Sequence, residues 1–158
     1  MTGCGLSPNP QPAPTVPSQL HGLRPSPAAV VERMARVVPD LYFDVNSHGL
    51  GKQERHRLDQ PATGIETLPY DFPNVAIVVE GHSDDRGLIE YNDHLAVERA
   101  EEVGRILLTH SFPEDRLRVA GFGYRSPQCV TQDTQRRQRN RRVDFRGADL
   151  VPETRTSR

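Results

Sequence analysis

Two oppositely charged side chains, Asp84 and Arg99, stand out in the stretch from Val75 to Ala100. Arg99 falls inside the apolar sector of a predicted helix, so its guanidinium should point inward. Burying that charge without a partner would be costly, and the nearest candidate partner in the chain is Asp84. A carboxylate and a guanidinium at one edge of a sheet can pair with each other, or can hold a zwitterion between them. From spacing alone, the structural ion pair and the ligand site are equally good interpretations.

A buried strand and an amphipathic helix are predicted to position these side chains. The strand, Val75–Gly81, is apolar on both faces and precedes a dense polar run, His82–Arg86. The helix is predicted to begin near Asn92, whose side chain can cap the first turn, and to end near His110. Its apolar face contains Leu95, Ala96, Ala100, Val103, Ile106 and Leu107, and its polar face contains Glu98, Glu101, Glu102 and Arg105.

The segment before the central strand predicts a short strand and an interrupted helix. Leu41–Asn46 alternates, with Phe43 and Val45 facing one way and Tyr42 and Asp44 the other. From Gly51 to Leu68 the apolar spacing is helical, but Pro61 removes a backbone donor. We therefore expect a break at Gln60–Pro61, after which Pro69 and Pro73 close the connection to the central strand.

Two further strands are predicted after the long helix. Leu117 and Val119 alternate with Arg116 and Arg118, and Gly121 ends that strand. A polar segment with helical potential, Thr131–Asn140, leads to a last strand in which Val143 and Phe145 alternate with Arg142, Asp144 and Arg146. This alternation predicts one wet face of the sheet, so that two helices cover only the other face.

Several ordered motifs resemble those of a known family. GHSDDRGLIEYNDHLAVERA resembles the signature of the OmpA-like peptidoglycan-binding domain, and its DDRG and EYN elements are most similar to the peptidoglycan-associated lipoprotein (Pal) branch. LYFDVNS, GFGYRSP and NRRVDF resemble the opening strand and the last two strands of the family. The motifs stand in the family's order and together span about two-thirds of the chain, which makes them far more specific than any one alone.

The resemblance implies a fold and a non-enzymatic binding function. The fold is an α/β two-layer sandwich of β-α-β-α-β-β order, with helices on one face of a four-stranded mixed sheet. In the family, residues matching Asp84 and Arg99 hold the ammonium and the carboxylate of diaminopimelate in uncrosslinked peptidoglycan stems, which suits charge-assisted hydrogen bonding. Asn92 either adds an amide contact or only caps the helix. Phe43 and Asp44 resemble ligand-contacting positions of the Pal branch, although core packing is the commoner fate of a phenylalanine.

Composition agrees with one small domain and a tail. The chain has 158 residues, 35% hydrophobic, and no Trp, which permits one modest core. A net charge of −1 argues against a general nucleic-acid binder. We expect a Pro-rich flexible tether over residues 1–25, a short lead-in helix over 26–39, the binding domain over 40–148 and a disordered tail over 149–158.

Cys4 is a candidate lipidation site. Met-Thr-Gly-Cys resembles the end of a bacterial lipobox, although the charged and apolar regions of a signal peptide are missing from the chain. Ahead of a periplasmic-type domain and a tether, acylation of Cys4 is favoured over an ordinary disordered N-terminus. A bridge between Cys4 and Cys129 is only weakly indicated, because their contexts differ. No stretch approaches the ~20 apolar residues of a membrane span.

Other chemistries have weaker support. His82, Asp84 and His94 could be metal ligands, but His94 falls on the polar side of the helix and no further ligand stands at a motif spacing, so we expect neither a metal nor another cofactor. A hydrolase is disfavoured because Ser83 lacks a nucleophile-elbow context. The arginine cluster could contact nucleic acid or an anionic glycan, but a solvated strand entry, or a structural role for Arg142, is favoured. The cluster comprises Arg136, Arg137, Arg139, Arg141 and Arg142.

The sequence therefore predicts a non-enzymatic peptidoglycan-binding module on the periplasmic side of the outer membrane of a Gram-negative bacterium, anchored through Cys4. The alternative is a periplasmic protein-interaction subunit of an envelope complex, with the same fold and a vestigial wall site. Tol-type envelope proteins are candidate partners in either case. The presence of both Asp84 and Arg99 favours the first interpretation.

Overall fold

The structure is a computed structural model that describes residues 28–29, 31–33, 41–60, 67–130 and 132–150. The expected tether, Cys4 and Pro61 lie outside these residues. Within the predicted lead-in segment, Ala28, Ala29 and 31–33 are helical. None of the helices in the described part of the chain is both long and apolar enough to cross a membrane.

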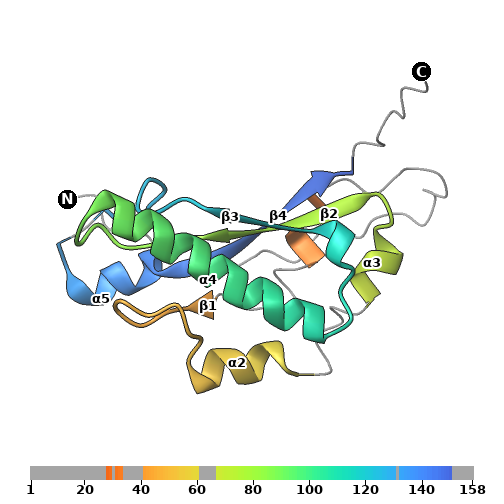
Figure 1. Ribbon diagram of the computed structural model, residues 1–158, viewed down its shortest axis with the longest axis horizontal. Helices are drawn as coiled ribbons and strands as arrows, with labels where there is room; N and C mark the ends of the chain where they lie inside the picture. Colours follow the sequence, from red (N-terminus) through yellow and green to blue (C-terminus); the bar gives the residue numbers. More distant parts are fainter. Residues whose placement is uncertain (1–27, 30, 34–40, 61–66, 131, 151–158) are drawn as a thin grey trace, which may run out of the picture.

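A four-stranded mixed sheet forms the centre of the fold (Figure 1). Its strands are β1 (Leu41–Tyr42), β2 (Val75–Gly81), β3 (Leu117–Gly121) and β4 (Arg142–Asp149), in the order β1-β4-β2-β3. β2 runs parallel to β3 and antiparallel to β4, and β1 pairs antiparallel with β4. The predicted mixed sheet of four strands is confirmed, with β2 in its interior.

Helices of very different length connect the strands. They are α2 (Lys52–Leu58), α3 (Leu68–Asp71), α4 (Ile89–Thr109) and α5 (Thr134–Arg137), with 3-10 turns η3 (Glu114–Arg116) and η4 (Gln138–Asn140). α4 crosses the sheet, and every position of its predicted apolar face is buried. Leu58 of α2 joins the same core, which also contains Leu41, Phe43 and alternate residues of β2. Burial of this apolar surface is the main favourable contribution to folding.

Two glycines allow α4 to approach the sheet closely. Gly81 and Gly121 are register partners at the ends of β2 and β3. A Cβ at Gly81 would lie 1.9 Å from the carbonyl oxygen of Ala96, and one at Gly121 would lie 2.5 Å from Cγ2 of Val97. Any side chain at either position would push α4 away from the sheet, because packed interiors have no room for an added methyl group. The first half of α4 is therefore held tightly at the carboxyl end of β2.

The segment from β1 to α3 differs in detail from the prediction. β1 ends at Tyr42, and although Phe43 is buried as predicted, Val45 is exposed because the chain turns at Asn46, where φ is 53°. α2 ends at Leu58, just before the predicted break. Pro69, predicted to lie in a connection, instead occupies the first turn of α3, where a missing N–H is tolerated.

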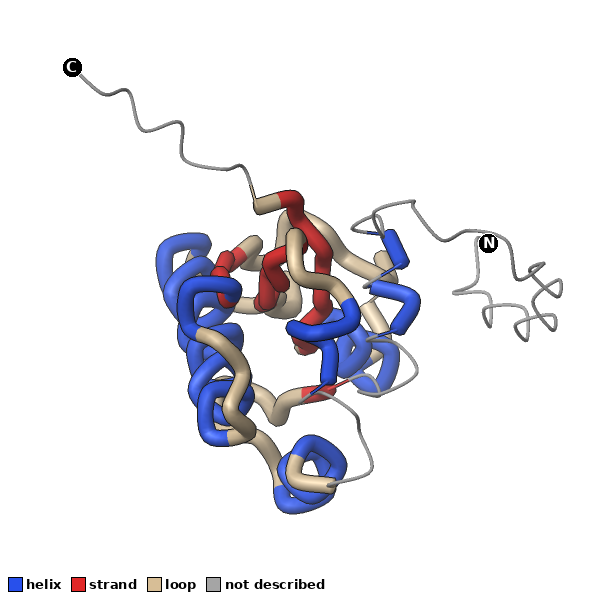
Figure 2. The backbone as a smooth tube through the Cα atoms, turned by 90° about the vertical axis from the view of Figure 1, so that its right-hand side faces the viewer, coloured by secondary structure: helices blue, strands red, loops and turns tan. Residues whose placement is uncertain are grey.

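The predicted wet face of the sheet is partly covered. Ala76 and Val78 point away from the α4 side of β2, yet both are buried. Figure 2 shows α4 on one side of the strands and the helical residues next to the N-terminal grey trace on the other. The two helices predicted within the domain, α2 and α4, share one core on one face as expected, and the burial of Ala76 and Val78 shows that the other face is not fully exposed to solvent. Further along the same face the polar character remains, because Arg146 of β4 pairs with Glu80 at 2.9 Å.

The C-terminal boundary also shifts. Asp149, predicted to begin the tail, is the last residue of β4 and pairs with Val75. The backbone N–H of Leu150 then donates to the carbonyl oxygen of Asn74 at 2.9 Å. The ordered sheet therefore includes the start of the predicted tail.

Candidate ligand site at the carboxyl end of β2

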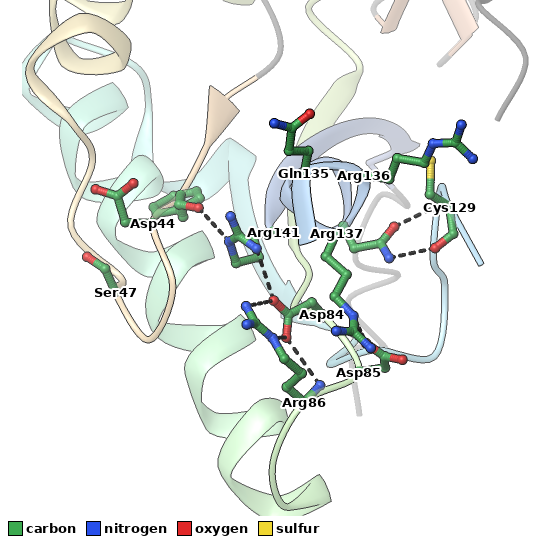
Figure 3. A network of polar contacts seen from close by, with 12 residues as sticks. Asp44, Ser47, Asp84, Asp85, Arg86, Cys129, Gln135, Arg136, Arg137 and Arg141 are labelled. Carbon is green, nitrogen blue, oxygen red and sulfur yellow. Dashed lines mark hydrogen bonds and ion pairs between the residues drawn. The ribbon is translucent and has the colours of Figure 1, made fainter. Parts of the chain in front are cut away.

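Four segments meet where β2 ends: the polar loop after β2, the start of α4, the loop after β1, and the junction of η4 with β4. The polar loop is fixed through its backbone, since His82 N–H donates to the carbonyl oxygen of Arg142 and Ser83 N–H donates to that of Gly123, at 2.9 and 2.8 Å. Figure 3 shows Asp84 between Arg86 and Arg141, with Asp44 and Ser47 on the neighbouring loop. The end of an interior strand thus carries a preformed cluster of charges.

Asp84 is a buried carboxylate with two arginine partners. Nη2 of Arg86 lies 2.8 Å from Oδ2, and the Arg86 backbone N–H donates to Oδ1 at 3.2 Å. Nη1 of Arg141 also donates to Oδ2, at 3.0 Å. Burial alone would raise the pKa of the Asp84 carboxyl, but the hydrogen bonds from Arg86 and Arg141 outweigh it and hold the pKa below its usual value. Asp84 is therefore an anion at neutral pH.

Arg99 points inward as predicted, but its acceptors differ from those expected. Its side chain is completely buried and donates to three backbone carbonyl oxygens, those of Ser47, His82 and Asp44, at 2.8, 2.8 and 3.0 Å. The predicted direct pairing with Asp84 is not formed. Burial, with repulsion from Arg141, lowers the pKa of Arg99 to about 10, so the guanidinium stays charged at neutral pH. Arg99 thus ties the loop after β1 to the end of β2.

Phe43 and Asp44 have different positions in this cluster. The Phe43 side chain is buried in the core, and its ring lies 5.2 Å from the Arg99 guanidinium carbon, within cation–π distance. The Asp44 side chain is exposed at the edge of the site, while its carbonyl oxygen accepts from Arg99. Of these two predicted contact residues, Asp44 is the one accessible to a ligand in this structure.

Arg141 is a site residue that the sequence analysis missed. It is buried, and in addition to Asp84 its Nε donates to the carbonyl oxygen of Phe43 at 2.9 Å. The N–H of Phe43 donates back to the carbonyl oxygen of Arg141, also at 2.9 Å. The double arginine of the NRRV motif was the available signal, but the motif pointed to a structural role for Arg142, which is buried and pairs with Asp144 at 2.8 Å. The structural role expected for Arg142 is confirmed.

Asn92 lies inside α4 and not at its cap. The helix begins at Ile89, with Leu88 in the N-cap position and no capping side chain. The buried Asn92 side chain instead donates from Nδ2 to the carbonyl oxygen of Arg86 at 2.8 Å. The predicted capping role was therefore wrong, because the helix starts a turn earlier than the capping pattern indicated. Asn92 fixes the backbone at Arg86.

A pocket of about 280 Å³ opens beside the charge cluster, between the loop after β1 and the start of α4. Its lining residues are Val45, Asn46, Arg86, Gly87 and Tyr91. Arg86 connects this pocket to Asp84. Val45 and Asn46 lie between the two carbonyl groups of the β1 loop that accept from Arg99, so this guanidinium supports the pocket wall from behind.

The alternative metal ligands do not converge. The His82 ring stacks on Phe122 with centroids 5.5 Å apart, and its Nε2 lies 3.4 Å from Oδ2 of Asp144. His94 is on the surface of α4, where Nδ1 lies 3.4 Å from Oε1 of Glu98. Within the described ranges no group of three or more His, Cys, Asp or Glu side chains is arranged to hold a metal ion.

The arginine cluster is divided between surface and site. Arg136 and Arg139 are exposed, whereas Nε of Arg137 lies 2.8 Å from Oδ1 of Asp85. Asn140, which precedes Arg141, accepts from the N–H of Cys129 and donates to its carbonyl oxygen, at 2.9 and 2.7 Å. Cys129 itself is buried.

Comparison with known proteins places this site in a family context. The family model described as OmpA family matches residues 42–141. The chain is 31% identical over 103 residues to the peptidoglycan-associated lipoprotein of Rhizobium meliloti, a match that covers 65% of this chain and 56% of the relative. It is 30% identical over 115 residues to that of Pseudomonas aeruginosa, covering 73% of this chain and 66% of the relative. The chain thus spans between about half and two-thirds of the length of these relatives.

Solved structures with the same arrangement include two different kinds of protein. The crystal structure of the peptidoglycan-associated lipoprotein from Burkholderia pseudomallei aligns with a TM-score of 0.61 and 28% identity, covering 69% of this chain and 89% of that one. The C-terminal domain of Helicobacter pylori MotB aligns with a TM-score of 0.62 and 23% identity, covering 70% of this chain and 84% of that one. The second likeness concerns the fold alone.

Proposed function

The chain belongs to the OmpA family, and we propose that it binds peptidoglycan non-covalently through the pocket beside Asp84. The observation that carries this proposal is the buried, ionised Asp84 carboxylate, which Arg86 connects to an open pocket and which accepts from two guanidinium groups. The names of the Rhizobium, Pseudomonas and Burkholderia relatives, peptidoglycan-associated lipoproteins, support the same ligand class. Nothing in this function requires catalysis.

We infer that the ligand group is the amino-acid end of a diaminopimelate stem residue. Its ammonium would bind Asp84 and its carboxylate would bind a guanidinium, both through charge-assisted hydrogen bonds. The family resemblance points to Arg99 for the carboxylate, but Arg99 is completely buried and donates to three backbone carbonyl groups, whereas Arg86 is the guanidinium that lines the pocket. Asn92 would hold the Arg86 backbone in place, Phe43 would support Arg99, and Asp44 would contact the ligand at the edge of the site.

In this proposal the domain links the cell wall to the outer membrane from the periplasmic side. The link would be a lipid on Cys4, at the end of a Pro-rich segment, with Tol-type envelope proteins as candidate partners. Acylation and a disulfide both use the cysteine sulfur, so a lipidated Cys4 and a Cys4–Cys129 bridge exclude each other. Mass spectrometry of the membrane fraction, with Cys4→Ser as control, tests the anchor. If Cys4 is unacylated in protein expressed from its native start, the proposed lipid anchor is contradicted.

A second candidate function rests on the apolar residues next to the pocket. Leu88, Ile89 and Tyr91 are 74%, 50% and 48% exposed. Clustered exposed apolar side chains are typical of protein–protein contacts. They favour the alternative of a periplasmic protein-interaction subunit. In that case the charged side chains around Asp84 would stabilise the fold and would not bind a ligand.

Asp84→Asn separates the two functions. The variant keeps the shape of the side chain but loses the charge, so binding to a diaminopimelate-containing muropeptide should weaken by ~2–5 kcal/mol, which is at least about thirtyfold. Calorimetry measures the affinity and circular dichroism checks the fold. Asp115→Asn, an exposed aspartate away from the pocket, is the matched control and should bind as the parent does. A folded Asp84→Asn protein with parental affinity would favour the interaction subunit.

A further inference from the structure

Arg86 lies between Asp84 and the open pocket. Among the residues that line the pocket, Arg86 is the one that hydrogen-bonds to Asp84. Its Nη2 lies 2.8 Å from Oδ2 and its Nε lies 3.4 Å from Oδ1. The Arg86 side chain is 37% exposed, against 8% for that of Asp84. The guanidinium therefore covers the pocket side of the carboxylate.

The carboxylate has no acceptor site left for a ligand. A carboxylate accepts about four hydrogen bonds. Oδ1 accepts from the Arg86 backbone N–H and from Nε, and Oδ2 accepts from Nη2 of Arg86 and Nη1 of Arg141. Arg141 is buried and also donates to the Phe43 carbonyl oxygen, whereas the side-chain hydrogen bonds of Arg86 to the described residues go to Asp84 alone. An ammonium can thus reach Asp84 only by displacing the Arg86 guanidinium.

We propose that Arg86 is the specificity-determining residue of the pocket, because it admits a ligand that supplies both an ammonium and a carboxylate and excludes one that supplies only an ammonium. This inference deepens the proposed function and rests on it. When a zwitterion enters, the ammonium takes the place of the guanidinium on Asp84, and the displaced guanidinium takes the carboxylate of the ligand. The net charge of the pocket does not change, and every charged group keeps a partner.

A simple amine would break this balance. It would leave the displaced guanidinium without an anion, so the original Arg86–Asp84 pair would compete with binding. The third residue of a peptidoglycan stem offers this contrast, since diaminopimelate ends in an ammonium and a carboxylate whereas lysine ends in an ammonium only. Arg86 would therefore make the pocket select diaminopimelate stems over lysine stems, with Arg99 supporting the wall behind it.

The displacement of the Arg86 guanidinium from Asp84 by the ligand ammonium is called the exchange below. Calorimetry with two soluble muropeptides, one containing diaminopimelate and one containing lysine, tests it. The parent should bind the diaminopimelate muropeptide at least about thirtyfold more tightly. In Arg86→Gln the lysine muropeptide should bind more tightly and the diaminopimelate muropeptide less tightly, so that the ratio falls about tenfold. Arg86→Lys, which keeps the cation, should retain the preference. Arg105→Gln is the matched control, because Arg105 is also an exposed arginine that pairs with a carboxylate, Glu102, but far from the pocket.

The outcomes separate this inference from the proposed function. If Arg86→Gln weakens both muropeptides equally, or changes neither, the exchange is overturned while wall binding stands. If the parent binds neither muropeptide, the proposed function fails and the exchange fails with it. A second readout is the nuclear magnetic resonance signal of the arginine Nε–H groups. Adding the diaminopimelate muropeptide should shift the Arg86 signal and leave that of the buried Arg116 in place, and an unmoved Arg86 signal on saturation would also overturn the exchange.

Discussion

Two buried arginines fix the opposite ends of β2, and one of them, Arg99, holds the loop that lines the pocket beside Asp84. At the carboxyl end, Arg99 donates to the carbonyl oxygens of His82, Asp44 and Ser47. At the start of the strand, Arg116 donates to the carbonyl oxygens of Val75, Pro69 and Phe72. Both guanidiniums thus join a strand end to a neighbouring loop or helix. Burial lowers the pKa of each below the usual arginine value.

The two ends of β2 differ in the charged side chains that surround each buried arginine. Near Arg99 stand the buried Asp84 and Arg141, and Arg86 extends from Asp84 to the pocket. Near Arg116 the carboxylate that affects its pKa is Asp115, which is exposed. A buried arginine bound to carbonyl groups is therefore a structural feature that occurs with or without a ligand site. The buried carboxylate beside a pocket is what distinguishes the end that we propose binds the ligand.

The largest effect on stability is expected when the side chain of either buried arginine, Arg99 or Arg116, is replaced. Arg99→Met and Arg116→Met should each lower the free energy of unfolding by about 2–4 kcal/mol, because buried carbonyl oxygens lose a charged donor. The loss is less than the sum of the hydrogen bonds, since the variants no longer bury a charge. Urea unfolding measures the stability, and calorimetry at a temperature where both variants are folded measures muropeptide binding.

The same pair of variants tests the comparison directly. Arg116→Met should bind the muropeptide as the parent does, whereas Arg99→Met should lose most of its affinity. Equal loss of affinity in both variants would mean that binding follows global stability and that the two ends do not differ in function.

The next effect concerns the close approach of α4 to the carboxyl end of β2. Gly81→Ala should destabilise by about 1–3 kcal/mol, because the added methyl group would meet the backbone of Ala96. Gly104→Ala is the matched control on the same helix, since a Cβ there would lie 3.4 Å from Cδ2 of Leu117, and alanine is the better helix former. Thermal unfolding followed by circular dichroism compares them. If Gly81→Ala is as stable as Gly104→Ala, α4 can shift relative to β2 to accommodate a side chain at position 81.

A smaller effect is expected for Asp84→Asn on stability. Replacing the carboxylate weakens the hydrogen bonds from Arg86 and Arg141, which should cost about 1–2 kcal/mol. Asp115→Asn, at the other end of β2, should stay within about 0.5 kcal/mol of the parent, as exposed substitutions usually do. Urea unfolding of both variants provides the measurement. A loss of stability in Asp115→Asn as large as in Asp84→Asn would remove the distinction between the two ends.

The smallest effect is the acid dependence of stability. The pKa of Asp84 is lower in the folded protein than the usual value of about 3.9, so the unfolded chain binds protons more tightly near that pH. The contribution of Asp84 is therefore fully present above about pH 4 and is lost as the pH falls through the folded pKa. Urea unfolding from pH 5 downward should show a shallower fall for Asp84→Asn than for the parent. If the stability of the parent and of Asp84→Asn fell in parallel as the pH was lowered, the lowered pKa of Asp84 would be contradicted.

Periodicity predicted the parts of the fold that follow from burial. The apolar face of α4, the inward position of Arg99 and the interior strand β2 all follow from repeats of 3.6 or two residues. Asp84 was identified because it is the nearest carboxylate that could serve as a partner for the inward Arg99. These residues are recognisable from sequence because their own side chains carry the pattern.

The missed features depend on contacts that no side-chain pattern marks. The acceptors of Arg99 are backbone carbonyl groups, which every residue has, so the sequence favoured the visible carboxylate of Asp84. The position of Arg141 depends on the register of β4 against β1, which is set by Leu41 opposite Val143. Arg116 was assigned to an alternating strand, but it lies in η3 just before β3, and its side chain is buried. Tertiary contacts, and not local pattern, decided each of these cases.

The hydrogen bonds that build the site connect distant parts of the chain, with consequences for folding kinetics. Arg141 and Phe43 are 98 residues apart, Arg141 and Asp84 are 57 apart, and Arg99 and Asp44 are 55 apart. Closing loops of this length costs entropy that only later contacts recover, so such pairings slow folding. A chain that has formed α4 and β2 but has not yet added β4 to the sheet lacks Arg141 on Asp84. If the proposed site is correct, the chain becomes able to bind only when the last strand is in place, and muropeptide affinity measured during refolding should report the completion of the sheet.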